Sequence, residues 1–208
     1  MDYIIYSEKF PRIFIVEGYS MTILDEMLEA NRKFVIALPV EYVDYYPATS
    51  KMPDREIAIF TCMDTRLVDF LEPAMGIKRG EVKVIKNAGN SITGPFEATI
   101  RSLIVSIFEL GVKEIIVIGH LDCGISHTTS QSLIKKMLDR GISLDAIKMI
   151  DKELEDWIDH FHHPIDNVVE AVRKIRNSPL IPKDVPVHGL MFNPTTGEVE
   201  VVIDGYQV

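Results

Sequence analysis

Two short segments of the chain gather side chains that can bind a metal and move a proton. The first is Cys62-Met-Asp64-Thr-Arg66, and the second is His120-Leu-Asp-Cys123. Two thiolates and one imidazole suit zinc, and three protein ligands leave the fourth position of the metal open for chemistry. The residue types therefore point to a catalytic zinc site at Cys62, His120 and Cys123.

The spacing of the first segment suggests a control on that site. Side chains two residues apart in an extended segment point the same way, so Cys62, Asp64 and Arg66 would share one face. The rigid guanidinium fork of Arg66 can hold the Asp64 carboxylate in place. Without that hold, the anionic Asp64 would tend to become the fourth zinc ligand and block the site. We interpret the pair as a gate, and expect activity to rise with pH as hydroxide replaces the carboxylate.

Simpler interpretations of these residues stay open at this point. A buried cysteine is common as a small apolar residue, and a lone His-x-x-Cys is weak support for a metal. A closed structural zinc site usually takes four Cys or His ligands. The chain has two cysteines, so a closed site would need Asp64 or another residue as its fourth ligand. Asp122, inside the second motif, is interpreted as a cap of the turn that carries Cys123.

The elements that must position these residues follow from the periodicity of the chain. Short β-rich runs cover 56–61, 82–86 and 114–118, and the first and third stop just before the two motifs. In open parallel sheets, ligands bind beyond the carboxyl ends of the strands. If runs 56–61 and 114–118 are neighbouring strands, about 4.8 Å apart, Cys62 and His120 can meet in space.

Helices alternate with these strands. The apolar pattern predicts helices over 22–36, through 67–71 with a break near Pro73, over 94–108 opened by Gly94-Pro95, and over 130–140, 144–161 and 165–177. A terminal hairpin is predicted for 185–192 and 199–203, an extended arm for 1–20 and an irregular segment for 39–53. This alternation predicts an α/β fold: a single domain over 1–208 with a mainly parallel central sheet, flanking helices and a C-terminal hairpin strand.

Composition limits the functions available. The chain has 208 residues, and its 22 Lys and Arg against 31 Asp and Glu give a net charge of −9. That negative field argues against nucleic acid as a partner. No apolar run suggests a membrane span, and the first residues lack the features of a secretory signal, so we expect no membrane partner and a cytoplasmic protein. Two cysteines are too few for a disulfide scaffold.

On its two motifs, the sequence resembles the β-class carbonic anhydrases. The family pattern Cys-x-Asp-Ser-Arg followed by His-x-x-Cys matches residues 62–66 and 120–123, with Thr65 in place of the usual Ser. The small archaeal-type branch of the family is the most similar one. The combined motif is specific, whereas neither half is specific alone.

Beyond the motifs the similarity is uneven. It includes Lys86-Asn-Ala-Gly-Asn90, the helix that begins at Phe96, and the stretch from Asn167 to Gly189. The likeness is strong over 55–125, fair over 165–205, and poor over 1–50 and 126–163.

The resemblance implies a zinc enzyme that interconverts carbon dioxide and bicarbonate, with one Zn²⁺ per chain. Cys62, His120 and Cys123 would be the ligands, and zinc-bound hydroxide would attack carbon dioxide. Asp64 and Arg66 would act as a catalytic dyad. Asp64 would accept a hydrogen bond from the zinc-bound water, or would serve as the fourth ligand in a closed state.

Two further expectations concern the substrate pocket and the assembly. The position of Gly89 near a strand end suggests that its backbone lines the substrate pocket. In family members an N-terminal helix packs across a neighbouring subunit, and residues 1–50 fit poorly onto a self-contained sheet. We therefore expect a homodimer or a higher even-numbered homo-oligomer, with residues 1–50 at the subunit interface.

Two other functions compete with this interpretation. The same scaffold carries hydrolases of carbonyl sulfide or carbon disulfide, and the motif with its aspartate is compatible with both activities. The second alternative is a non-catalytic, zinc-containing regulatory or bicarbonate-sensing module. Asp64 and Arg66 argue against the module, because a structural zinc site does not need the dyad.

The remaining histidines have simpler interpretations. His127, four residues beyond the second motif, is a candidate proton shuttle. His160, His162 and His163 are expected to form a solvated cap at a helix end rather than a second metal site. His188 is interpreted as a structural histidine whose ring nitrogens have partners.

Overall fold

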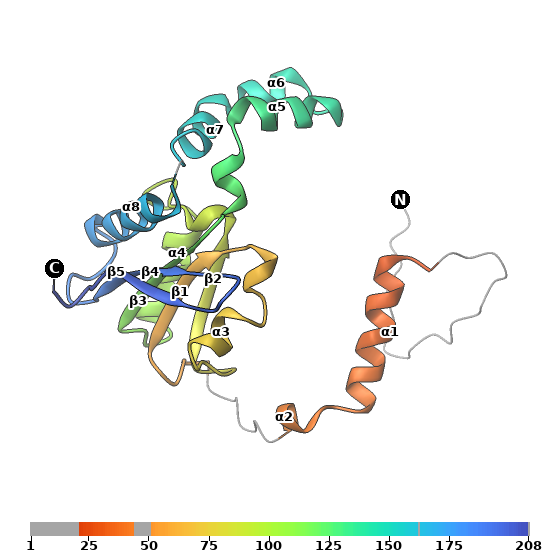
Figure 1. Ribbon diagram of the computed structural model, residues 1–208, viewed down its shortest axis with the longest axis vertical. Helices are drawn as coiled ribbons and strands as arrows, with labels where there is room; N and C mark the ends of the chain where they lie inside the picture. Colours follow the sequence, from red (N-terminus) through yellow and green to blue (C-terminus); the bar gives the residue numbers. More distant parts are fainter. Residues whose placement is uncertain (1–20, 44–50, 162, 208) are drawn as a thin grey trace. The chain divides into compact units, whose positions relative to one another are not determined.

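The computed structural model of the chain describes residues 21–43, 51–161 and 163–207 (Figure 1). The chain divides into two compact units, residues 1–49 and 50–208, and each is described by itself. The predicted arm at 1–20 lies outside the described residues.

The first unit is described over residues 21–43, which hold two helices. Helix α1 (Ile23–Ile36) begins at a capping box. The Thr22 hydroxyl accepts the Asp25 backbone N–H, and the Asp25 carboxylate accepts the Thr22 backbone N–H. This confirms the helix predicted over 22–36. A short helix, α2 (Val40–Val43), lies in the segment that was expected to be irregular, and that part of the prediction was wrong.

The second unit is built on a five-stranded sheet in the order β2-β1-β3-β4-β5. The strands are β1 (Ile57–Cys62), β2 (Val82–Asn87), β3 (Glu114–His120), β4 (Val187–Phe192) and β5 (Val199–Ile203). The first four are parallel, and β5 pairs antiparallel with β4. The predicted fold class, an α/β domain with a mainly parallel sheet and a terminal hairpin strand, is confirmed.

Six helices and three 3₁₀ turns connect these strands. The helices are α3 (Leu71–Ala74), α4 (Ala98–Phe108), α5 (Ser130–Asp139), α6 (Leu144–Lys148), α7 (Asp151–Ile158) and α8 (Pro164–Asn177). The turns are η1 (Thr65–Leu67), η2 (Ala88–Asn90) and η3 (Gly124–His127). Within the described parts of the chain, no helix is long and apolar enough to cross a membrane.

Three predicted helices differ from the structure. Helix α4 begins at Ala98 and not at Gly94-Pro95, because the Glu97 carboxylate accepts the N–H groups of Thr99 and Ile100 and so caps the helix there.

The other two differences concern the number of helices. The helix expected through 67–71 is replaced by η1 and α3, and Pro73 lies inside α3. The segment 144–161 holds two helices, α6 and α7, which are separated at Met149 and Ile150.

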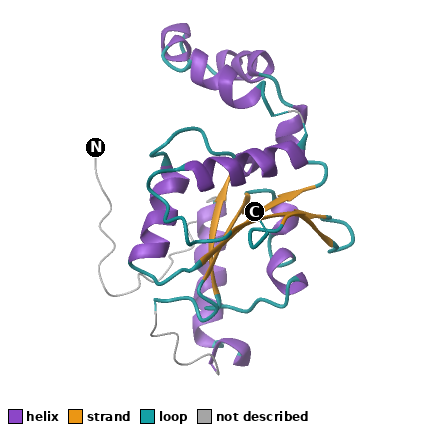
Figure 2. Cartoon of the chain, turned by 90° about the vertical axis from the view of Figure 1, so that its left-hand side faces the viewer, coloured by secondary structure: helices purple, strands orange, loops and turns teal. Residues whose placement is uncertain are grey.

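Helices cover both faces of the sheet (Figure 2). On one face, α4 and α8 pack on the strands through buried residues such as Leu103 and Val172, whereas η1 and α3 cover the other face through Leu67 and Leu71. Helix α8 lies very close to β3, since a Cβ at Gly119 would come within 2.5 Å of Val168 Cγ2. Glycine at this strand position therefore permits the close packing of α8.

Helices α5, α6 and α7 form a separate group after β3, and both views show them together at one end of the domain (Figures 1 and 2). The Asp159 carboxylate accepts the Ser130 backbone N–H at 2.8 Å and the Ser130 hydroxyl at 2.6 Å. These two bonds connect the end of α7 to the first residue of α5, so the first and last helices of the group are held together.

Candidate metal centre

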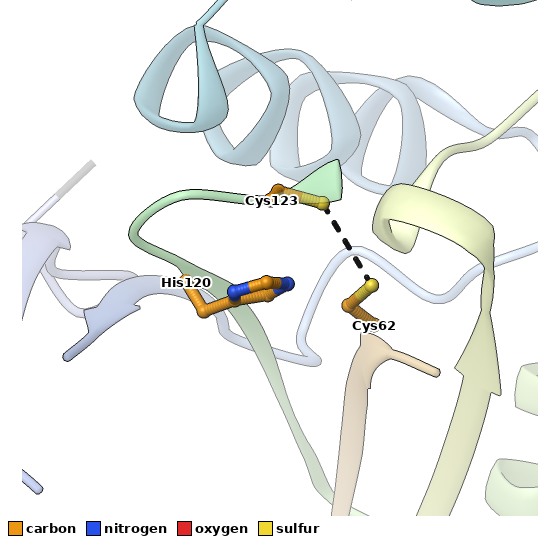
Figure 3. Close-up of side chains that lie close together, drawn as sticks. All are labelled: Cys62, His120 and Cys123. Carbon is orange, nitrogen blue, oxygen red and sulfur yellow. Dashed lines mark hydrogen bonds between the residues drawn. The ribbon is translucent and has the colours of Figure 1, made fainter. Parts of the chain in front are cut away.

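The two sequence motifs meet because β1 and β3 are neighbouring parallel strands. Thr61 pairs with Ile118, which places the carboxyl ends of the two strands side by side. Cys62 is the last residue of β1 and His120 is the last residue of β3. Cys123 follows in the turn after β3, and Figure 3 shows the three side chains directed toward one another.

The geometry of these three side chains fits a zinc ion. Their ligand atoms all lie within 4.8 Å of one another, and the side chains are buried. The Sγ atoms of Cys62 and Cys123 are 3.8 Å apart. Two thiolates at about 2.3 Å from one tetrahedral Zn²⁺ would be separated by about 3.8 Å. The observed spacing therefore matches two corners of a zinc tetrahedron.

His120 presents the correct nitrogen to the two sulfurs. Its Nδ1 lies 2.9 Å from the Leu121 carbonyl, which can only accept, so Nδ1 carries the proton and Nε2 carries the lone pair. Among the described residues, Nε2 is a buried atom without a hydrogen-bond partner. A metal held between His120, Cys62 and Cys123 would account for this otherwise costly atom.

The two thiols are electrostatically different when no metal neutralises them. The hydrogen bond from Cys123 lowers the pKa of Cys62 against the opposing effect of burial, and the His120 ring and the backbone N–H groups of Gly89 and Asp64 lower it further. The same bond and burial raise the pKa of Cys123. Because thiolates are the form that binds a metal, binding of zinc at both cysteines would release the proton that Cys123 holds.

Asp64 and Arg66 form a two-pronged ion pair beside this cluster. Arg66 Nε donates to Asp64 Oδ1 at 3.0 Å and Nη2 donates to Oδ2 at 2.9 Å. The side-chain bond from Arg66 lowers the pKa of Asp64 to about 2, so the carboxylate is ionised near neutral pH. Asp64 Oδ2 lies 3.8 Å from His120 Nε2, which places it at the edge of the ligand set.

The backbone that carries this pair is not extended, contrary to the sequence interpretation. Residues Thr65–Leu67 form η1, and Asp64 is its N-cap, with Oδ1 accepting the Arg66 backbone N–H at 2.9 Å. A tight turn, and not the two-residue period of a strand, brings Asp64 and Arg66 together. Both carboxylate oxygens are directed to Arg66, so the structure has Asp64 turned toward its arginine; the closed state with Asp64 as fourth ligand stays a prediction.

Asp122 is a partner of Arg66 that sequence reasoning missed. Arg66 Nη1 donates to Asp122 Oδ2 at 3.0 Å, and Nη2 donates to the Asp122 carbonyl at 2.7 Å. His127 Nε2 lies 3.3 Å from Asp122 Oδ1. Asp122, in the second motif, therefore holds Arg66 and contacts the exposed His127. Its carboxylate was expected to cap the turn that carries Cys123, and it binds these two side chains instead. The only sequence feature that could have indicated this contact is the acidic residue inside His-x-x-Cys, which can pair with the arginine of the first motif.

Gly89 lies directly beside the cluster, in η2 after β2. It has a positive φ of 71°, which favours glycine, and its N–H points to the Cys62 sulfur. Asn167 of α8 donates from Nδ2 to the Gly89 carbonyl at 2.5 Å and to the Asn90 carbonyl at 3.3 Å. Asn167 thus fixes the turn from helix α8, 78 residues further along the sequence. A substrate-lining role for Gly89 stays a prediction.

The other histidines lie away from the cluster. His160 Nδ1 is 3.1 Å from the Asp156 carbonyl at the end of α7, which fits the expected helix cap. His162 lies outside the described residues, and exposed His163 precedes α8. His188 lies near the opposite end of the sheet, 3.1 Å from Glu114 Oε1.

The fold and the cluster together define an α/β protein with a candidate metal site of two cysteines and one histidine at adjacent strand ends. The carbonic anhydrase family model matches residues 57–199. The chain belongs to this family, and its resemblance to the β class is confirmed. Its place in the archaeal-type branch stays a prediction.

Individual relatives agree with this family. The putative carbonic anhydrase YvdA of Bacillus subtilis is 40% identical over 190 residues, which cover 90% of this chain and 94% of YvdA. The crystal structure of β-carbonic anhydrase isoform I (TvaCA1) of Trichomonas vaginalis superimposes with a TM-score of 0.83 at 45% identity, covering 89% of this chain and all (100%) of that one. A carbon disulfide hydrolase of Acidithiobacillus thiooxidans is 30% identical over 158 residues, covering 70% of this chain and 76% of the hydrolase.

Proposed function

We propose that this chain catalyses the reversible hydration of carbon dioxide to bicarbonate and a proton, with one zinc ion held by Cys62, His120 and Cys123. The observation that carries the proposal is the buried cluster of two sulfurs 3.8 Å apart beside a histidine Nε2 that has no hydrogen-bond partner among the described residues. Zinc bound there would act as a Lewis acid that makes hydroxide available from water near neutral pH.

The neighbouring residues would orient and control the reaction. Arg66 holds both oxygens of Asp64, so the carboxylate is kept as a hydrogen-bond acceptor at the edge of the cluster. Asp122 holds Arg66 in turn. Gly89 presents its N–H to Cys62, and its backbone is proposed to line the substrate pocket at this edge of the cluster.

His127 is proposed to hand protons to the buffer. Its side chain is 71% exposed and contacts Asp122 Oδ1. Arg66 stands between Asp122 and Asp64, and a guanidinium does not give up its proton. Protons would therefore reach His127 through water and not through the Asp64–Arg66–Asp122 chain.

The test is stopped-flow hydration of carbon dioxide by the zinc-loaded protein at about pH 8.5, where hydroxide is plentiful. We expect fast turnover, and a loss of roughly 100-fold or more in Asp64→Ala, as for a group that handles a proton in the transition state. Asp139→Ala, which removes an exposed carboxylate on α5, is the matched control and should keep the wild-type rate. Equal rates in wild type and Asp64→Ala would remove the proposed role of the dyad.

A second candidate function is the hydrolysis of carbon disulfide or carbonyl sulfide. The similarity to the hydrolase of Acidithiobacillus thiooxidans favours testing it. A protein that holds one zinc per chain but does not hydrate carbon dioxide would move the assignment to these substrates. A protein that turns over none of the three would be a non-catalytic zinc-containing module, although the braced Asp64–Arg66 pair supports an enzyme.

The proposal includes a homodimer or a higher even-numbered homo-oligomer, with residues 1–50 at the interface and 1–208 acting as one functional domain. Residues 23–36 of α1 include no buried side chain, and their apolar members are exposed, for example Ile23 at 76% and Ile36 at 86%. Exposed apolar sets of this size mark interaction surfaces. Light scattering at micromolar concentration should give an even-numbered assembly, and a monomer would contradict this part of the proposal.

The proposed compartment is the cytoplasm. Both cysteines are free, and a reducing compartment keeps them available as ligands. Recovery of the native protein in a soluble cytoplasmic fraction, with zinc bound, tests this assignment; recovery in a secreted fraction would contradict it.

A further inference from the structure

The helical group α5–α7 contributes one side chain to the metal centre. Phe161 follows α7, is 4% exposed, and belongs to the same apolar cluster as Cys62 and Cys123. It lies outside both sequence motifs, in the segment where the resemblance to the family is poor. Phe161 therefore connects this segment to the apolar cluster that contains both cysteines.

The ring of Phe161 lies against the backbone next to the ligands. A Cβ at Gly89 would come within 2.8 Å of Phe161 Cε2 and within 2.8 Å of Ile125 Cγ2. The N–H of the same glycine points to the Cys62 sulfur. Phe161 and Ile125 therefore form an apolar wall at the margin of the metal centre.

The other side of this wall is a cavity. A cavity of about 580 Å³ between α7 and α8 is lined by Phe161 together with, among others, Trp157, Asn167 and Ser91. Because Phe161 both lines this cavity and packs beside the cysteines, its ring lies between the two. Removing the ring would join the cavity to the space at the ligand sulfurs.

The chain fixes the backbone on the N-terminal side of Phe161. The Asp159 carboxylate, two residues earlier, is bound by the backbone N–H and the hydroxyl of Ser130. The Phe161 N–H donates to the Ile158 carbonyl at 3.1 Å, and Ile158 is itself buried. These bonds anchor the backbone that carries the ring to the helices α5 and α7.

We propose that Phe161 is a specificity-determining residue that sets the size of substrate accepted at the metal centre. This inference rests on the proposed function. Carbon disulfide is longer than carbon dioxide, because a bond from carbon to sulfur is longer than one to oxygen. A rigid ring beside the cysteines limits the space for the longer molecule, whereas a shorter side chain would accept both.

The first test compares substrates in the zinc-loaded protein. The ratio of kcat/KM for carbon disulfide to that for carbon dioxide should rise about tenfold or more in Phe161→Ala, the scale at which pocket size discriminates between small substrates. Phe161→Leu should give a smaller rise. Trp157→Ala is the matched control, because half-buried Trp157 lines the cavity but does not belong to the cysteine cluster, and it should leave the ratio unchanged.

The second test does not depend on turnover. Zinc-loaded protein is mixed with excess dipicolinate, and the rate of zinc transfer is followed. Transfer should be faster in Phe161→Ala than in wild type, and unchanged in Trp157→Ala, since the lost ring opens a path to the ligands. If the alanine variant does not fold, the substrate ratio and the rate of zinc transfer are compared between wild type and Phe161→Leu.

The outcomes separate this inference from the proposed function. A wild-type protein that neither retains zinc nor hydrates carbon dioxide contradicts the proposed function. A wild-type protein that does both, with a substrate ratio and a zinc-transfer rate that stay within about twofold in Phe161→Ala, overturns the specificity role alone. Equal changes in Trp157→Ala and Phe161→Ala would also overturn it, because general loosening of α7 would then explain both.

Discussion

Two buried histidines near opposite ends of the same sheet show what separates a candidate metal ligand from a structural side chain. His120 ends β3 at the carboxyl edge and is 0% exposed, whereas His188 lies near the start of β4 and is 9% exposed. In both rings Nδ1 contacts the backbone, and in both Nε2 has no aligned hydrogen-bond partner in the described structure. Burial and partner counts therefore do not distinguish them.

The direction of the backbone bond does distinguish them. His120 Nδ1 faces a carbonyl and must donate, which leaves a lone pair on Nε2. His188 Nδ1 accepts the N–H of Gly205 at 3.1 Å, so the proton of its neutral ring is on Nε2, 3.1 Å from Glu114 Oε1. The neutral His120 ring can bind a metal through its Nε2 lone pair. The His188 ring could do so through Nε2 only if its proton left that nitrogen.

The surroundings of the two rings agree with this difference. Two sulfurs lie near Nε2 of His120, and the Asp64 carboxylate 3.8 Å away is already held by Arg66. At His188, in contrast, Glu114 Oε1 lies 3.1 Å from Nε2, and Tyr206 packs edge-on against the ring with centroids 4.6 Å apart. A protonated Nε2 beside a carboxylate is a favourable electrostatic contact that needs no metal. The sequence interpretation of His188 as structural therefore agrees with the contacts that the structure gives it.

The largest expected effect comes from exchanging each histidine for glutamine. His120→Gln should lose its zinc and lose more than about 100-fold in activity, the upper range for removing a group that only supports a ligand. His188→Gln should keep one zinc per chain and most of its activity. Metal analysis of the purified proteins, followed by stopped-flow hydration of carbon dioxide, checks both variants. Equal zinc loss in the two would break the distinction drawn from the tautomers.

A smaller effect is expected on stability at the His188 end. His188→Ala leaves the Gly205 N–H without its acceptor and removes the contact with Glu114, so unfolding should become easier by about 1–3 kcal/mol, the cost of an unsatisfied buried group. Urea unfolding monitored by circular dichroism measures this change. His188→Asn, which keeps a short polar side chain, is the conservative control. An alanine variant as stable as wild type would show that the end of the sheet does not depend on this ring.

The two ends of the sheet also differ in how far the sequence predicts them. Apolar runs that stop at Cys62 and at His120 were enough to place both side chains at strand ends, and the order of parallel strands then brings them together. The bounds of the helices were less predictable. Both Pro95 and Glu97 are compatible with the start of α4, and the helix begins after Glu97 because the Glu97 carboxylate accepts the first backbone N–H groups.

Contacts between distant segments were not predictable from any local pattern. Asn167 holds Gly89 across 78 positions of sequence, and Asp122 holds Arg66 across 56. Such bonds carry no period and no fixed spacing, so they become visible only after the sheet has placed its loops. The same is true of Phe161, which reaches the apolar cluster of Cys62 and Cys123 only through the three helices α5, α6 and α7 that separate it from Cys123.

The smallest expected effect concerns Tyr206 at the His188 end. Its hydroxyl donates to Glu114 Oε2 at 2.7 Å, and this bond raises the pKa of Tyr206 above its ordinary value. The folded protein then holds this proton more tightly than the unfolded chain does, so stability is lost as pH rises above about 10.

Tyr206→Phe removes the titrating group, and unfolding in urea between about pH 9 and 11 should therefore weaken less in this variant than in wild type. The same comparison at neutral pH should show a change smaller than that of His188→Ala, because the Tyr206 side chain is 70% exposed. Parallel pH profiles for wild type and variant would mean that the Glu114 bond does not persist in solution. The electrostatic account of the His188 end would then rest on His188 and Glu114 alone.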